Sequence, residues 1–172
     1  MIEMMDQGKN MTLTQERLKQ VVSFEPTTGV FTRILKAKRA VIGRELGYKK
    51  SNGYIALSID GQKYFAHRLA WLYVYGEFPK HDVDHIDGDR ANNKIENLRD
   101  VTRSVNLQNL KAAKSHNKST GVLGAYLHIS GKFMSRIQVN KKDVYLGLFE
   151  TAEQAQQAYL TAKQQFHKGY VA

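Results

Sequence analysis

The feature that most constrains this sequence is a short polar stretch, residues 83–106, rich in acidic, imidazole and carboxamide side chains. It opens with the pair Asp84-His85 and carries Asn97 and Asn106 further on. Carboxylate and amide oxygens suit a hard cation such as Mg²⁺ or Mn²⁺, and a histidine left free can act as a base. Since neighbouring residues of a strand face opposite sides, we expect the backbone to leave strand geometry at this pair. The stretch predicts a strand, a loop, a second strand and a helix, with the ion between the first strand's end and the helix.

Composition narrows the class of protein. The chain has 172 residues, room for one domain or two small ones, and a net charge of +10 from 26 basic and 16 acidic residues. Such an excess favours a polyanionic partner, nucleic acid above all. The chain has no cysteine, which excludes disulfides and thiolate metal sites and fits a reducing cytoplasm. No apolar run approaches the roughly 20 residues of a membrane helix.

Local patterns in the first two thirds of the chain predict short elements. The clearest is a hairpin, in which alternating runs flank the turn Asp60-Gly61, a pair suited to positive φ. The other expected elements are a helix capped by Thr12 or Thr14 and running to Val22, a strand over 30–35, a basic loop over 36–50, a helix over 67–75 that ends at Gly76, and a helix from Thr102 to about Ala113 with Val105 and Leu110 buried.

The last third of the chain has a different pattern. Short apolar runs over 122–129, 132–139 and 143–149 predict three strands, and Thr151 with Gln154 has the spacing of a capping box that starts a helix. The chain is thus expected to be α+β, with a small three-stranded antiparallel sheet packed on one helix at its C-terminal end. The predicted organisation is a leader over 1–12, a domain over 13–110, a basic linker over 111–120 and a second domain over 121–172.

Plainer interpretations of the polar stretch exist beside the metal site. Asp87, Asp89, Asn92 and Asn93 are typical turn formers. A calcium loop is a further alternative, but the acidic residues miss the alternation and the glycine register that an EF-hand requires. Upstream, His67 opens an apolar helix, where a histidine more often caps or packs than binds a ligand.

The stretch resembles the HNH endonuclease motif in the variant whose third letter is Asn. The resemblance rests on residues 84–88, 92–93, 96–99, Thr102 and Asn106, together with 67–71 upstream. It implies a ββα-metal fold that holds one divalent ion. By the same resemblance, Asp84 and Asn106 bind the metal, His85 is the general base and Asn97 supports it. Other members often have histidine where Asn106 stands, which leaves the preferred ion open.

The C-terminal part resembles an AP2 DNA-binding domain. The most specific segment is Tyr145–Ala155, although Phe133 stands where the family often has Trp and Ser135 where it often has Ala. The resemblance implies that the sheet enters the major groove of DNA, as other β-sheet readers do. Arg136 and Gln138 lie two residues apart and would share a sheet face. The candidate DNA contacts are Tyr126, Lys132, Arg136, Gln138, Lys141 and Lys142.

Together these patterns predict a metal-dependent endonuclease acting on double-stranded DNA, of phage-encoded or homing type. We expect one Mg²⁺ or Mn²⁺ ion, no organic cofactor, no association with membranes, a monomer and a cytoplasmic location. A non-catalytic, sequence-specific DNA-binding regulator on a nuclease scaffold is the alternative, and RNA is a further possible substrate.

Overall fold

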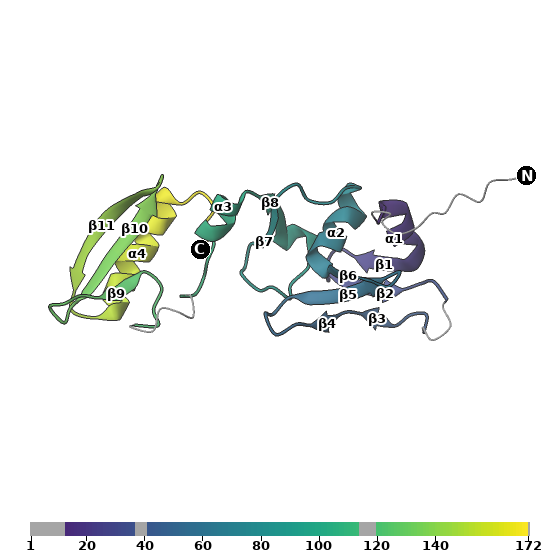
Figure 1. Cartoon of the computed structure of the whole chain (residues 1–172), viewed down its shortest axis with the longest axis horizontal. Coiled ribbons are helices and arrows are strands. Elements are labelled where there is room, and N and C mark those ends of the chain that lie inside the picture. Colours follow the sequence, from purple (N-terminus) through teal and green to yellow (C-terminus); the bar gives the residue numbers. More distant parts are fainter. Residues whose placement is uncertain (1–12, 37–40, 114–119, 172) are drawn as a thin grey trace, which may run out of the picture. The chain divides into compact units, whose positions relative to one another are not determined.

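The computed structural model describes residues 13–36, 41–113 and 120–171 (Figure 1). The chain divides into two compact units. The first unit holds the chain up to Pro79 together with Ala91–Glu96, and the second holds Lys80–Arg90 and the chain from Asn97 onward. The backbone therefore passes from one unit to the other three times. The predicted leader, 1–12, and most of the predicted linker lie outside the described residues, so the domain boundaries stay predictions.

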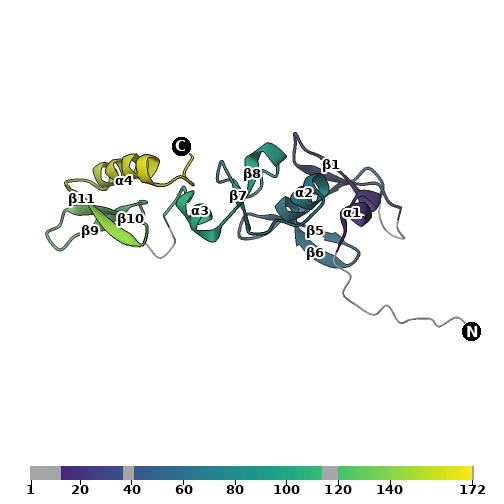
Figure 2. The ribbon, with the colours of Figure 1, turned by 90° about the horizontal axis from the view of Figure 1, so that it is seen from above.

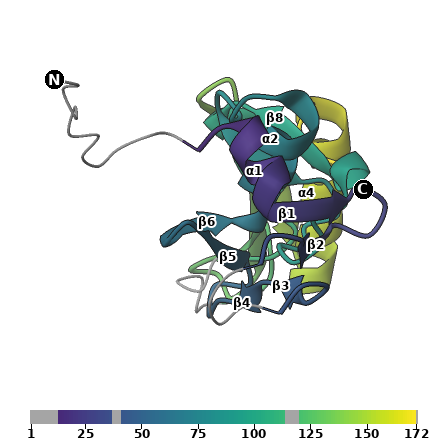
Figure 3. The same ribbon diagram turned by 90° about the vertical axis from the view of Figure 1, so that its right-hand side faces the viewer.

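In its described residues, the first unit contains two α-helices and six short strands. Two three-stranded sheets have the orders β1-β2-β3 and β4-β5-β6, all pairs antiparallel. Figure 3 shows α1 and α2 side by side. The elements are α1 (Gln15–Val21), β1 (Val22–Glu25), β2 (Val30–Arg33), β3 (Glu45–Leu46), β4 (Tyr48–Lys49), β5 (Ile55–Ile59), β6 (Gln62–Phe65) and α2 (Ala66–Tyr75).

Local signals account for most of these boundaries. Thr14 caps α1 by accepting a hydrogen bond from the backbone of Arg17. Asp60 and Gly61 both have positive φ, 48° and 81°, in the turn between β5 and β6, as the hairpin pattern predicts. Gly76 ends α2 with a φ of 86°, a conformation that glycine adopts without steric cost. These predictions are confirmed.

The prediction for His67 is confirmed, whereas the prediction of a loop over 36–50 is wrong in part. His67 is buried and stacks on the Phe65 ring, with ring centroids 5.4 Å apart, so it packs in the core of the first unit. The stretch 36–50, expected to be a loop, contains β3 and β4. Each of these strands is two residues long, too short to show an alternating pattern. β3 pairs with β2 across an intervening loop, and β4 pairs with the nearby β5.

The second unit begins with a two-stranded ribbon, β7 (Asp82–His85) and β8 (Leu98–Val101). The 3-10 turn Ile95–Asn97, directly before β8, contains the point where the chain re-enters this unit. Helix α3 (Arg103–Gln108) follows, shorter than expected because it ends at Asn109. Thr102 occupies the N-cap position without a side-chain cap, and Val105 and Leu110 are half-buried rather than buried. The order of strand, loop, strand and helix agrees with the prediction.

The rest of the second unit is a three-stranded sheet backed by one helix. The sheet has the order β11-β10-β9, and α4 covers one of its faces (Figure 2). The capping box of Thr151 and Gln154 is present, as predicted. Gly124 has positive φ and lies where a Cβ would collide with the ring of Tyr159 on α4, so helix and sheet sit close together. The elements are β9 (Ala125–Leu127), β10 (Phe133–Val139), β11 (Lys142–Phe149) and α4 (Ala152–Phe166).

Within the described ranges, none of the helices has the length and apolar character needed to cross a lipid bilayer.

Candidate active site

The candidate site is built on the ribbon of β7 and β8. Asp84 pairs with Arg99 across the ribbon and His85 pairs with Leu98, so both residues lie in regular strand. The expectation that the backbone leaves strand geometry at this pair is wrong: the turn comes after His85, where the backbone of Gly88 donates to the His85 carbonyl. The two side chains therefore leave opposite faces of the ribbon. Both are buried, with 6% and 4% of their surface exposed.

Two side chains hold the carboxylate of Asp84. Arg99 donates to its Oδ2 from both Nε and Nη2, at 2.9 and 2.7 Å. Asn109 donates from its amide nitrogen to the same oxygen at 3.1 Å and to Oδ1 at 3.3 Å. The same amide also reaches the backbone oxygen of His85 at 3.0 Å. A charge-assisted pair of this kind fixes the orientation of the carboxylate inside the fold.

Asn106 lies against a different carboxylate from the expected one. Its amide nitrogen donates to Oδ2 of Asp82 at 3.0 Å, and Arg103 donates to the same oxygen at 3.1 Å. The structure thus places Asn106 beside Asp82. Asp84, two residues after Asp82 on the same strand, is bonded by Asn109 instead. Asn106 and Asn109 are one turn apart, which puts both on the same side of α3.

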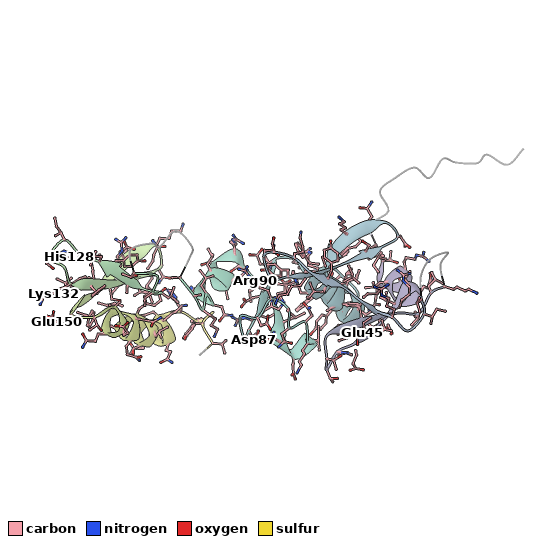
Figure 4. The ribbon with its side chains drawn as sticks, turned by 90° about the horizontal axis from the view of Figure 1, so that it is seen from below. Glu45, Asp87, Arg90, His128, Lys132 and Glu150 are labelled. Atoms are coloured by element: carbon pink, nitrogen blue, oxygen red, sulfur yellow. The ribbon has the colours of Figure 1, made fainter. Side chains whose placement is uncertain are left out.

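Asn97 closes the loop that follows His85. Its side chain donates to Oδ1 of Asp87 and accepts from the Asp87 backbone, both at 3.0 Å, while its carbonyl accepts from Ile86. Asp87 also accepts from the backbone of Asp89, as a turn former does. Figure 4 labels Asp87 and Arg90 in this loop. These contacts give Asn97 a bracing position beside the candidate base.

The chemistry of the donor set fits a hard cation. No group of three or more His, Cys, Asp or Glu side chains that could hold a metal ion occurs among the residues described. Magnesium, however, needs only one or two carboxylates and completes its shell with amide oxygens, water and substrate. Both bonds from Arg99 go to Oδ2 of Asp84, which leaves Oδ1 with the single long contact to Asn109. A cation on Oδ1 would share this carboxylate with the guanidinium of Arg99.

The outer face of the β9–β11 sheet carries the candidate DNA contacts. Ser135 and Ile137 are buried, so Arg136 and Gln138 are exposed on the opposite face, as expected. The guanidinium of Arg136 lies 5.4 Å from the centre of the Tyr126 ring and bonds Asp143 at 3.2 Å.

The other candidate contacts lie at the ends of the strands. Lys132 is 2.6 Å from Glu150, and Figure 4 shows these two residues close together with His128. Lys141 and Lys142 are exposed, and Lys141 has a φ of 65° in the hairpin turn between β10 and β11.

Two residues around Asp84 were not assigned a role from the sequence. Arg99 stands opposite Asp84 across the ribbon, and a strand register would have been needed to find it. Asn109 follows Asn106 by one helical turn, a spacing that marks it as a second residue on the same face. The choice between the two asparagines depends on how far the helix is shifted along the strand, which the sequence does not encode locally.

Comparisons with known proteins bear on this segment. A family model described as HNH endonuclease matches residues 64–108. No curated protein matches the chain. A solved structure described as "DNA binding and cleavage by the HNH homing endonuclease I-HmuI" is 29% identical, with a TM-score of 0.39, over 51% of this chain and 50% of that one. The chain thus spans about half the length of that relative. Asp84, His85, Asn97 and Asn106 all lie inside the segment that the HNH endonuclease family model matches.

Proposed function

We propose that this chain is a divalent-metal-dependent endonuclease that hydrolyses phosphodiester bonds in duplex DNA. The observation that carries the proposal is the pair Asp84-His85, buried on β7 and backed by β8 and α3 inside the HNH-matched segment. The resemblance to phage and homing HNH proteins extends it to an enzyme of that type. A monomeric state and a cytoplasmic location stay predictions.

In the proposed reaction each residue has a separate task. His85 takes the proton from the attacking water, a role suited to histidine at neutral pH. Asn97 holds the loop after His85 through Asp87. By the resemblance, Asp84 and Asn106 would hold one Mg²⁺ or Mn²⁺ ion, for which the Asn106 amide would have to leave Asp82. When bound, the ion would neutralise the scissile phosphate and stabilise the leaving oxygen. The expected products carry 5′-phosphate and 3′-hydroxyl ends.

We further propose that β9–β11 and α4 form an AP2-like DNA reader. Three strands with one helix behind them leave one face exposed, and that face presents Tyr126, Arg136 and Gln138. An arginine beside an amide can read base edges in the major groove. The basic segments 36–50 and 111–118, although partly outside the described residues, would contact the DNA backbone through their lysines and arginines.

The first test is cleavage with and without a divalent ion. We expect supercoiled plasmid to be converted to nicked or linear DNA in Mg²⁺ or Mn²⁺, and cleavage to stop when a chelator is added in excess. The physical reason is that carboxylate and amide oxygens cannot neutralise the negative charge of the scissile phosphate, whereas a bound divalent ion can. Agarose gels over time would measure the rate, and cleavage that persists in chelator would contradict the proposed metal dependence.

The same assay distinguishes the nuclease from the alternative function, a non-catalytic DNA-binding regulator. A non-catalytic DNA-binding regulator would bind the plasmid but leave it intact with every ion tested. The full set of candidate catalytic residues inside the matched segment, Asp84 and His85 among them, favours the nuclease, because a pure regulator needs neither a base nor metal ligands. Competition of duplex RNA against the plasmid would show whether RNA is a substrate.

The proposed sheet interface gives a separate prediction. Arg136→Ala should weaken duplex binding about tenfold or more, as the loss of a base-contacting arginine costs roughly 1–3 kcal/mol. Binding would be measured by fluorescence anisotropy in chelator, so that cleavage does not interfere. Arg17→Ala is the matched control, because Arg17 is also an exposed arginine paired with an aspartate, Asp60, but lies in the first unit. Equal affinities of both variants and the parent would refute the interface.

A further inference from the structure

The segment after α4 packs on the end of α3. In this segment, 167–171, the backbone of Gly169 donates to Oε1 of Gln108 at 2.9 Å, and Lys111 donates to the carbonyl of Val171. Residues far apart in the sequence are thus joined within the second unit. The contact partners on the α3 side, Gln108 to Lys111, directly follow the candidate metal ligand Asn106.

Two further bonds from this segment reach the side chains that hold Asp84. Arg99 donates from Nη2 to the carbonyl of Gly169 at 2.5 Å, using the nitrogen that also binds Asp84. Asn109 accepts from the backbone of Val171 at its Oδ1, 3.3 Å away, while its amide nitrogen binds Asp84. Each partner of the Asp84 carboxylate is therefore bonded to Asp84 on one side and to the 167–171 segment on the other.

The segment is seated so closely that one position must be glycine. A Cβ on Gly169 would collide with the backbone oxygen of Val105 and lie 2.8 Å from its Cγ1. The φ of Gly169 is outside the left-handed region. An alanine at this position would therefore be destabilised by the steric clash and not by its backbone conformation. The clash is hard to relieve because the Val105 oxygen belongs to the backbone of α3.

Two lysines enclose the aromatic ring of the same segment. The Nζ atoms of Lys163 and Lys111 lie 4.5 and 4.9 Å from the centre of the Tyr170 ring. Lys163, on α4, also donates to the carbonyl of Leu110 at 2.5 Å. Burial, together with the charge of Lys111, lowers the pKa of Lys163 to about 8. The buried lysine thus has the Leu110 carbonyl and the rings of Tyr170 and Tyr159 around its Nζ, which gives the contact between α3 and the segment a defined geometry.

We propose that the 167–171 segment is a positioning element of the candidate active site, orienting Asp84 through Arg99 and Asn109. This inference rests on the proposed role of Asp84. Fixing Arg99 also fixes which oxygen of Asp84 it occupies, Oδ2, and so keeps Oδ1 turned away from Arg99. Because small misplacements of a catalytic group cost large factors in rate, loosening the segment at Gly169 should act mainly on cleavage. The segment also contacts the proposed DNA-binding sheet, where His167 bonds the Gln138 carbonyl at 2.8 Å, but neither Gly169 nor Gln108 takes part in that bond.

The experiment compares two variants in the full chain. Gly169→Ala pushes the segment off α3, and Gln108→Ala removes the acceptor of the Gly169 amide without adding atoms. Lys168→Ala is the matched control, because Lys168 is an exposed neighbour in the same segment. Plasmid cleavage is measured over a range of Mn²⁺ concentrations, Mn²⁺ binding is measured directly by calorimetry, duplex binding is measured in chelator, and circular dichroism checks the fold.

We expect Gly169→Ala to lower cleavage about 10- to 100-fold and to weaken Mn²⁺ binding, with a smaller effect in Gln108→Ala and none in Lys168→Ala. Duplex binding should be unchanged. In an Asn109→Ala background, Gly169→Ala should reduce the cleavage rate by a much smaller factor, since both substitutions act through the Asp84 carboxylate. If the double variant instead shows the product of the two single reductions in rate, the effect is general destabilisation and the inference is overturned.

The inference would also be overturned if Gln108→Ala, and a folded Gly169→Ala, cleave DNA at the rate of the parent protein and with the same dependence on Mn²⁺ concentration. Asp84→Asn separates its failure from that of the proposed function. If Asp84→Asn still cuts, the proposed function fails first. If Asp84→Asn is inactive while the segment variants cut normally, only the positioning role fails.

Discussion

Replacing His85 with alanine is expected to lower the rate of DNA cleavage by about 10²- to 10⁴-fold, the range that a general base contributes. His85 is buried at the end of β7, and its backbone carbonyl accepts from Asn109. That bond survives the substitution because it joins the side-chain amide of Asn109 to the main-chain carbonyl of residue 85 and does not use the imidazole. Duplex binding should stay within about twofold of the parent, since the proposed DNA-binding sheet does not include β7. Single-turnover cleavage and anisotropy would measure the two effects.

His85→Gln and His128→Ala complete the experiment. Glutamine keeps most of the side-chain volume but cannot take up a proton at neutral pH, so it should be as inactive as alanine. His128 lies after β9, where its ring contacts Ser130 at 2.9 Å, and its loss should leave the rate unchanged. Normal cleavage by His85→Ala would remove His85 from the mechanism.

Asp84→Asn is expected to abolish metal-dependent cleavage and also to destabilise the fold. The shape of the side chain is kept, but the buried charge that compensates Arg99 is lost. Removing one member of a buried ion pair costs roughly 3–5 kcal/mol, and since the Arg99 side chain is 24% exposed we expect about 2 kcal/mol. Urea denaturation would give the change in the free energy of unfolding, and a metal titration of cleavage would give the loss of activity.

Asp60→Asn is the control for the electrostatic part of this prediction. Asp60 also receives two bonds from one arginine, Arg17, but both side chains are over 40% exposed. Exposed pairs contribute little, so its loss should cost under about 1 kcal/mol. Unchanged cleavage by Asp84→Asn at limiting Mg²⁺ would exclude Asp84 as a metal ligand. An equal destabilisation by the two variants would show that burial adds nothing to the Arg99 pair.

The sequence predicted those elements whose signal lies within a few residues. Asp60-Gly61 requires positive φ at two successive positions, and Thr151 with Gln154 closes a capping box within one helical turn. Both features are decided before any distant part of the chain is in place. For the same reason the strand-loop-strand-helix order around Asp84 could be predicted.

What the sequence did not predict depends on contacts between distant residues. Strand β3, for example, is two residues long and pairs with β2 across an intervening loop. The pairing of Asn109 rather than Asn106 with Asp84 depends on the shift of α3 along β7, and both choices fit the same helical periodicity. The bonds from Gly169 and Val171 come from a segment with no periodic pattern, some 60 to 70 residues after their partners.

The repeated passage of the backbone between the two units limits how this protein can be divided for study. The loop Ala91–Glu96 lies in the first unit, whereas the strands on either side of it lie in the second. No single break in the chain separates the units. A fragment that ends before β7 lacks the loop Ala91–Glu96 of the first unit. A fragment that begins at β7 contains this loop but not the rest of the first unit, so the backbone of Ile95 loses its hydrogen bond to the Pro26 carbonyl. Neither half is therefore expected to fold as it does in the intact polypeptide, and activity should not be sought by mixing separately produced halves.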